Sequence, residues 1–200
     1  MKVCGLILAG GKARRFGKDK RFADLGGKHL IDHAISRLQA QVDELALSSN
    51  DPIPGWDTLT HLADQREAQG PLLGIAEGLA FAWDEGFDWL VTAPADSPFL
   101  PADMVAQLLK SQTPDTICFG KSGGRVHPVF GAWPTVKVTD LFATIAKGER
   151  KIDRAAASIA QVKTHEWPVD GPGGDPFFNI NHHEDLATAG AVYAANKASS

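Results

Sequence analysis

The sequence has little of what stabilises small secreted domains or crosses membranes. It contains two cysteines in 200 residues, Cys4 and Cys118, and no long apolar run. Both cysteines lie within apolar, strand-like segments, where a reduced thiol behaves as a small hydrophobic side chain, so we assign them no role. The apolar stretch after Lys2 is only seven residues long and runs into glycines and a basic cluster, which favours a first strand over a signal peptide. We therefore expect a cytoplasmic protein with no membrane partner.

The sequence also has no excess of positive charge. The formal net charge is −4, and 44% of the residues are hydrophobic against 22% charged, which is typical of a globular chain. This balance argues against broad nucleic-acid binding. The basic residues are nevertheless unevenly distributed, because seven of the twenty Lys and Arg lie between Lys12 and Lys28, alongside two acids. That segment is suited to binding anions.

Strand-like and helix-like segments alternate along the chain. Strands are expected at residues 3–8, 45–47, 58–62, 87–92, 116–119, 128–133 and 177–181, and helices at 29–41, 70–83, from 101 onward, 136–147 and 183–195. This alternation predicts an α/β fold with a doubly wound, mainly parallel, Rossmann-like sheet and an antiparallel excursion around Gly123-Gly124. We interpret residues 1–200 as a single domain, with two small domains as the less favoured alternative.

The segment from Leu8 to Lys20 joins the first strand to a glycine turn and a group of basic side chains. Gly10 and Gly11 lack a Cβ, so the backbone can approach a nucleotide closely, while Lys20 and Arg15 supply positive charge for phosphates. The Walker pattern and the dinucleotide fingerprint are both absent from this turn. The segment is therefore either a phosphate-binding loop of another kind or a solvated basic loop.

Two further positions favour chemistry at the carboxyl end of the sheet, where doubly wound folds bind their ligands. Asp96 follows an apolar strand and is flanked by prolines, which suits a magnesium ligand, although it could instead cap the helix near Pro101. Asn179 and Asn181 alternate on an expected short strand, so both should face one ligand.

The histidines give weaker signals. His29 and His33 lie four residues apart on an expected helix, but without a third ligand we interpret them as a surface pair with no function. His127 is either structural or part of a binding site. A Ser-His-Asp hydrolase has no support beyond the presence of those residue types.

Leu8-Ala-Gly-Gly11, followed by Arg15, an apolar residue, a glycine and Asp19-Lys20, resembles the signature of the MobA-like molybdenum cofactor guanylyltransferase family of nucleotidyltransferases. Further segments resemble the same family in the same order: Gly27-Lys28, Asp64 with residues 70–74, residues 95–98, His127-Pro128 and residues 179–181. The resemblance thus covers most of the chain.

The resemblance implies transfer of GMP from GTP to the terminal phosphate of molybdopterin or Mo-molybdopterin, with Mg²⁺ as cofactor. Residues 1–100, approximately, would bind the nucleotide, and residues 101–200 the acceptor. The implied nucleotide-binding residues are Leu8, Ala9, Gly10, Gly11, Lys20, Ser48, Asp64, Gly74 and Asp96. The implied catalytic residues are Lys20, Arg15 and Asp96, the metal ligands Asp96 and Asn181, and the acceptor-binding residues Asn179, Asn181, Arg125 and His127.

Several alternatives stay open from the sequence. The ribose contact falls on Ser48, whereas the family has an asparagine there and this chain has Asn50 two residues later. A cytidylyl- or sugar-nucleotidyltransferase of the same fold is the nearest enzyme alternative, and a non-catalytic pterin-cofactor carrier is the alternative of another class. Transient contacts with proteins that supply or receive the cofactor are also expected.

Overall fold

The computed structural model describes residues 1–10, 19–63, 70–110, 112–169 and 174–198. The strands in this part of the chain are β1 (Val3–Leu8), β2 (Asp24–Leu25), β3 (Lys28–His29), β4 (Glu44–Ser48), β5 (Thr60–Leu62), β6 (Trp89–Pro94), β7 (Thr116–Ser122), β8 (Arg125–Pro134) and β9 (Gln161–Trp167). The helices are α1 (Leu30–Gln39), α2 (Pro71–Asp84), α3 (Met104–Leu109), α4 (Val138–Ala146), α5 (Ile152–Ile159) and α6 (His183–Ala198), and 3₁₀ turns are η1 (Lys20–Phe22) and η2 (Thr135–Lys137).

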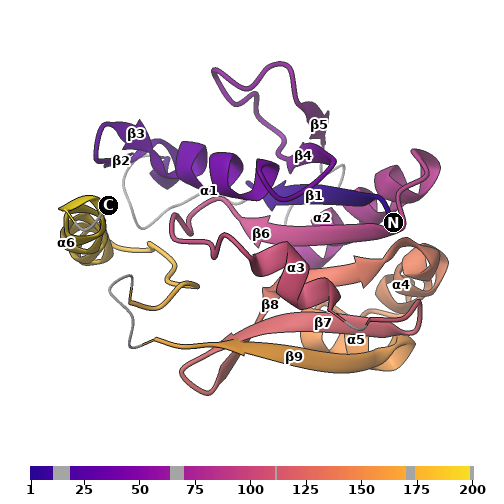
Figure 1. Cartoon of the computed structure of the whole chain (residues 1–200). Helices are drawn as coiled ribbons and strands as arrows, with labels where there is room; N and C mark the ends of the chain where they lie inside the picture. The colour runs from indigo at the N-terminus through magenta and orange to yellow at the C-terminus, as the bar shows by residue number, and fades with distance from the viewer. Residues whose placement is uncertain (11–18, 64–69, 111, 170–173, 199–200) are drawn as a thin grey trace.

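A seven-stranded sheet runs through the molecule in the order β5-β4-β1-β6-β8-β7-β9 (Figure 1). Strand β1 pairs in parallel with β4 and β6, and β9 pairs in parallel with β7. Strand β8 runs antiparallel to both of its neighbours, β6 and β7. The predicted α/β fold, mainly parallel with an antiparallel excursion, is confirmed.

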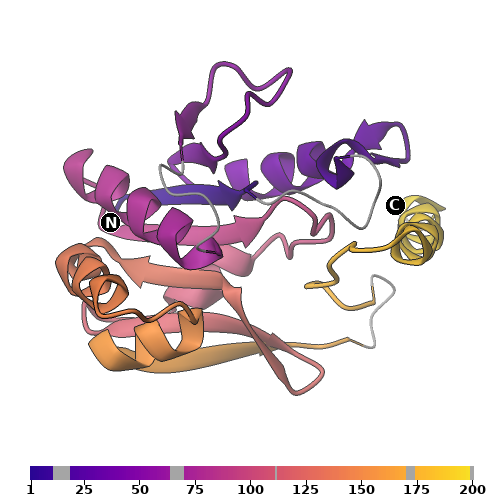
Figure 2. The same cartoon turned by 180° about the vertical axis from the view of Figure 1, so that it is seen from behind.

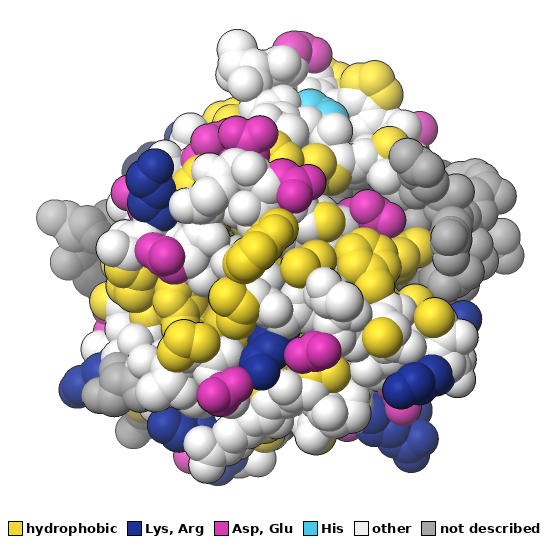
Figure 3. Space-filling view, turned by 90° about the vertical axis from the view of Figure 1, so that its right-hand side faces the viewer, with side chains coloured by type: hydrophobic (Ala, Val, Ile, Leu, Met, Phe, Trp, Pro, Cys, Tyr) yellow, Lys and Arg dark blue, Asp and Glu magenta, His cyan; other side chains and the backbone are white. Residues whose placement is uncertain are grey.

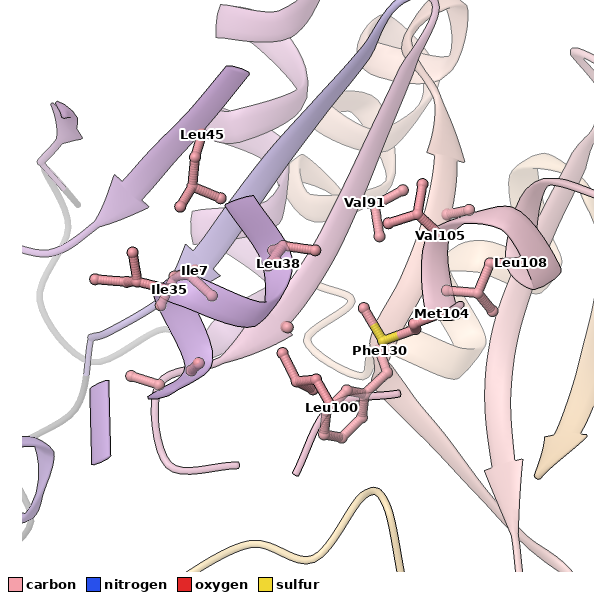
Figure 4. Close-up of a cluster of buried hydrophobic side chains, with 14 of the residues drawn as sticks. Ile7, Ile35, Leu38, Leu45, Val91, Leu100, Met104, Val105, Leu108 and Phe130 are labelled. Carbon is pink, nitrogen blue, oxygen red and sulfur yellow. The ribbon is translucent and has the colours of Figure 1, made fainter. Parts of the chain in front are cut away.

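Helices cover both faces of this sheet (Figures 1 and 2). One face carries α1 and α3, whose apolar side chains join β1, β4 and β6 in a single buried cluster. Figure 4 shows this packing, with Ile35 of α1 beside Ile7 and Met104 of α3 beside Phe130. The other face carries α2, α4 and α5. Each fully buried Leu or Ile contributes about 2 kcal/mol, so this two-sided burial holds the sheet between its helices.

A smaller cluster brings the C-terminal helix to the carboxyl end of the sheet. Leu25, Leu30, Phe99, Ile180 and Ala189 are all buried together there. Helix α6 therefore lies beside the β2–β3 hairpin and the start of α1 (Figure 1). The segment leading into α6 passes over the carboxyl edge, which places it at the predicted site.

Several local predictions were wrong or incomplete. Residues 177–181 form no strand, because their backbone makes isolated hydrogen bonds, such as Ile180 N to Asp96 O at 3.0 Å, instead of a ladder. The hairpin β2–β3 lies between β1 and α1, where no strand was predicted; Gly26 (φ 65°) and Gly27 (φ 87°) adopt the left-handed conformation its turn requires. Helix α5 and strand β9 were not predicted. The expected helix near Pro101 begins only at Met104.

The opposite end of the sheet, at the start of β1 and β6, has a different surface. Apolar side chains gather on this face (Figure 3). A hollow there is lined in part by Met1, Trp83 and Val136, each at least half exposed. Within the described residues, no helix has the length and apolarity needed to cross a membrane.

Candidate active site

Three strands end side by side at the carboxyl edge of the sheet. The register pairs Leu8 at the end of β1 with Ser48 of β4 and Pro94 of β6. The alignment continues one residue further, since Ala9 N donates to Ser48 O at 2.9 Å and Ala95 N donates to Leu8 O at 3.1 Å. Because these three strand ends are in register, the loops that follow β1, β4 and β6 all begin side by side at this edge of the sheet.

Lys20, Asp96 and Asn181 meet at this edge. The Lys20 ammonium donates to Asp96 Oδ2, and it also donates to Asn181 Oδ1 at 2.8 Å. The side chains of Lys20 and Asp96 are 20% and 13% exposed, so the pair is partly shielded from solvent but reachable. The predicted phosphate-binding lysine and the two predicted metal ligands thus form one cluster.

The second carboxylate oxygen of Asp96 lacks a hydrogen-bond partner within the described part of the chain. Asp96 Oδ1 is buried, with no hydrogen-bond donor among the described residues. A buried oxygen of this kind is costly unless a ligand satisfies it. Magnesium accepts one or two protein oxygens together with phosphate oxygens and water, so Asp96 and Asn181 fit such an ion. In the described residues, no group of three His, Cys, Asp or Glu side chains could hold a metal.

Asn179 does not join this cluster but contacts Ser97, the residue after Asp96. The Ser97 hydroxyl, which is fully buried, donates to Asn179 Oδ1, and Ile180 N donates to Asp96 O. These bonds hold the segment after residue 174 against the loop that carries Asp96. Asn179 and Asn181 therefore both reach the Asp96-Ser97 loop, although the expected strand that was to align them is absent.

The predicted nucleotide-binding residues of β4 and α2 are in direct contact. Ser48 is 5% exposed and lies under the first turn of α2; a Cβ added at Gly74 would stand 2.7 Å from its Oγ. The same added atom would be 3.4 Å from Leu8 Cδ2. Glycine at position 74 thus lets α2 approach the ends of β1 and β4. Asn50, by contrast, is exposed.

The acceptor-side prediction falls on the hairpin of β7 and β8. Arg125 is exposed at the start of β8, whereas His127 is half-buried against Phe130 and Phe177. Ser122 Oγ donates to Asp175 Oδ1 at 2.7 Å, so its single proton is used, and His127 Nε2 must be the donor in its 2.9 Å bond with Ser122. Burial lowers the pKa of His127, and the Arg125 charge adds to this, while Asp175 opposes it.

Comparison with known proteins places this geometry in a family. The model of the MobA-like NTP transferase domain matches residues 5–164. The chain belongs to this family. A molybdenum cofactor guanylyltransferase of Cereibacter sphaeroides is 40% identical over 191 residues, covering 94% of this chain and 96% of the relative.

Solved structures agree with the MobA-like fold. Molybdopterin-guanine dinucleotide biosynthesis protein A from Archaeoglobus fulgidus superposes with a TM-score of 0.74 at 23% identity, covering 97% of this chain and 99% of that one. The 2-C-methyl-D-erythritol 4-phosphate cytidylyltransferase from Thermus thermophilus has a TM-score of 0.69 at 17% identity, covering 97% and 100%. Because both superpose well, the fold is common to enzymes named for different bases.

Within this MobA-like chain, Ser122, His127 and Asp175 are grouped together but do not have the arrangement of a hydrolase triad. The Ser122 hydroxyl stands in the middle, donating to Asp175 and accepting from His127, so the histidine is not placed to take the serine proton, as the histidine of a hydrolase triad does. The interpretation of His29 and His33 as a surface pair was wrong for His33, which lies in α1. Its side chain is buried, and Nε2 donates to Leu25 O at 2.8 Å.

Some site residues lie outside the described residues, and others were not predicted. Gly11, Arg15 and Asp64 fall outside the described part of the chain. Arg21 and Ser97 contact the site but have no motif of their own; their only signal is that each directly follows a predicted site residue, Lys20 or Asp96.

Proposed function

We propose that this chain transfers GMP from GTP to the terminal phosphate of molybdopterin or Mo-molybdopterin, releasing pyrophosphate and forming the guanine dinucleotide cofactor. The observation that supports this most is the cluster of Lys20, Asp96 and Asn181 at the carboxyl edge of a MobA-like sheet. Relatives of nearly the same length carry the name molybdenum cofactor guanylyltransferase.

Charge neutralisation is the main task of such a site. GTP carries about four negative charges and the acceptor phosphate about two, so their repulsion dominates the barrier. Lys20, together with Arg15, would bind phosphate oxygens and hold the α-phosphorus in line with the acceptor. Asp96 and Asn181 would hold Mg²⁺, which when bound supplies further positive charge to the phosphates.

The acceptor needs no strong general base. A phosphate monoester is already mostly ionised at neutral pH, so the attacking oxygen has no proton to lose. His127, whose pKa is lowered by burial, then need not act as the base and can contribute to binding as an uncharged imidazole. We assign it, with Arg125 and Asn179, to the acceptor side.

The nucleotide would lie along the ends of β1, β4 and α2. The backbone of Leu8, Ala9 and Gly10 would contact the base and the start of the triphosphate, with Gly11, Asp64 and Gly74 beside them. Ser48 or Asn50 would contact the ribose; Asn50 is the more accessible.

The chain would act as one domain, with residues 1–100, approximately, binding GTP and the remainder the pterin. We place the reaction in the cytoplasm, where GTP is available, with transient contacts to proteins that supply or receive the cofactor. A cytidylyl- or sugar-nucleotidyltransferase remains the alternative enzyme, since the fold serves several bases. A carrier is disfavoured because it would not need a lysine-carboxylate pair at the phosphates.

Incubation with α-labelled GTP, magnesium and molybdopterin tests the proposal. We expect label in the pterin product and unlabelled pyrophosphate in solution. Label that stays in GTP while the pterin remains bound would favour the carrier. Calorimetry with GTP and CTP tests base choice, and clear preference for CTP would overturn guanylyl transfer.

A further inference from the structure

Arg21 is buried at the edge of the candidate site. Only 8% of its surface is exposed, although it is charged and directly follows Lys20. Arginine is seldom buried unless its guanidinium is fully paired. The partners of Arg21 therefore indicate what it holds together.

The guanidinium contacts three separate segments. Nη1 donates to Ala9 O at 2.7 Å and to Ser49 Oγ at 3.0 Å, which are the residues directly after β1 and β4. Nε donates to Asp19 Oδ1 at 2.9 Å, and Asp19 Oδ1 in turn accepts from Arg21 N at 3.1 Å. One rigid side chain thus ties two strand ends to the 3₁₀ turn that begins with Lys20.

Asp19 is held as a carboxylate by this arrangement. Its burial opposes ionisation, but the hydrogen bonds and the charge of Arg21 outweigh that effect and lower the pKa of Asp19. Because Asp19 caps the turn, its bond to Arg21 fixes the direction in which Lys20 leaves the backbone. Lys20 is then directed at Asp96.

We propose that Arg21 is a positioning residue that sets the separation between the backbone at Ala9 and the Lys20–Asp96 pair, so that one nucleotide meets both. The inference rests on the proposed function, in which Ala9 contacts the base side of GTP and Lys20 its phosphates. Arg21 itself would touch neither the base nor the phosphates. Its planar fork reaches Ala9 O and the Asp19 carboxylate at the same time, which the single ammonium of a lysine does not.

This role predicts a particular loss of affinity. When two parts of one ligand bind to two correctly spaced places, the whole binds far more tightly than either part. If the spacing becomes loose, each place still binds its own part, but the gain from joining them falls. Loss of a residue that only stabilises the fold would weaken the binding of the whole ligand and of each part alike.

The experiment compares the Kd of GTP, guanosine and pyrophosphate for the full-length wild-type protein and Arg21→Lys, by competition with a fluorescent GTP analogue. We expect the Kd of GTP to rise at least tenfold in Arg21→Lys, while those of guanosine and pyrophosphate change less than twofold. Arg37→Lys is the matched control, because Arg37 Nη1 also donates to a backbone carbonyl, Leu100 O at 2.9 Å. It should leave all three constants unchanged.

Two results would overturn the inference. One is an unchanged Kd for GTP in folded Arg21→Lys. The other is a rise in the Kd of guanosine or of pyrophosphate, each measured by itself, that is as large as the rise for GTP. If Arg21→Lys does not fold, Ser49→Ala removes one partner of Arg21 and should raise the Kd of GTP about threefold with the same selectivity; no change would be contradictory.

The proposed function fails separately. Wild-type protein that binds GTP but transfers no label would refute guanylyl transfer, while the binding comparison still decides the role of Arg21. Wild-type protein that binds no GTP would refute both.

Discussion

The Lys20 ammonium contacts the Asp96 carboxylate, although 76 residues separate the two in sequence. The contact arises because β1 and β6 are neighbours in the sheet and their following loops leave from the same edge. A cation stands there beside a carboxylate whose second, buried oxygen accepts no hydrogen bond from any residue that the structure describes. The arrangement suits a metal-bound triphosphate, which needs both kinds of group.

Removal of either charge should slow the reaction strongly without unfolding the protein. Asp96→Ala and Lys20→Ala should each lower turnover about a hundredfold, which corresponds to about 3 kcal/mol in the transition state. Steady-state kinetics with GTP and molybdopterin measures this, with circular dichroism to confirm folding. Lys137→Ala is the control, since it also breaks a lysine–aspartate ion pair, the more exposed one with Asp115 at 2.8 Å, which lies away from the site. Near-normal turnover in both site variants would refute the assignment.

Ser97 and Asn179 should act as one unit. Ser97→Ala leaves the Asn179 amide oxygen without its donor, so we expect the free energy of unfolding to fall by about 1 kcal/mol. We also expect reduced turnover, because the loop that holds Asp96 is then less firmly placed. Asn179→Ala should cost a similar amount, and the double variant little more than either single one. Urea denaturation gives the energies. Fully additive effects would mean that the two side chains do not depend on each other.

Acid should destabilise the protein partly through His127. Burial lowers the pKa of His127 in the folded protein below its usual value of about 6.5, so the unfolded chain binds its proton more readily. The stability contributed by neutral His127 is therefore present at pH 7.5 and declines as the pH falls below about 6.5. Between pH 7.5 and 5, wild-type protein should lose more stability than His127→Gln, in which an amide can still donate to Ser122. Equal losses in thermal unfolding would argue against this role.

The two thiols should be unreactive while the protein is folded. Burial raises the pKa of Cys4 to about 12 and that of Cys118 to about 11, so neither forms a thiolate at pH 8. A thiol-reactive dye should label both only after denaturation. Rapid labelling of native protein would show that the sheet opens around these residues.

The sequence predicts the core strands and the main site but not the contacts between loops. Strands β1 and β6 were predicted because each is a short apolar run followed by turn residues, and their proximity brings Lys20 to Asp96. Residues 177–181 alternate like a strand, yet Phe177 packs on Phe130 and Ile180 joins the cluster under α6, so no sheet partner is needed. The apolar pattern there reflects packing against loops and helices.

Arg21 is the opposite case. Nothing in a run of basic residues tells which one is buried, because that depends on where the ends of β1 and β4 stand in space. Helix α5 was missed for a related reason. It is only eight residues long and follows a charged stretch, so its apolar face is short.

A crystal structure with a non-hydrolysable α,β-methylene analogue of GTP and magnesium tests the central claim most directly. We predict the base beside the backbone of Ala9 and the α-phosphate between Lys20 and Asp96, with the metal on the carboxylate. A nucleotide bound elsewhere, for example in the hollow beside Trp83 at the opposite end of the sheet, with Lys20 and Asp96 free of phosphate, would contradict the account.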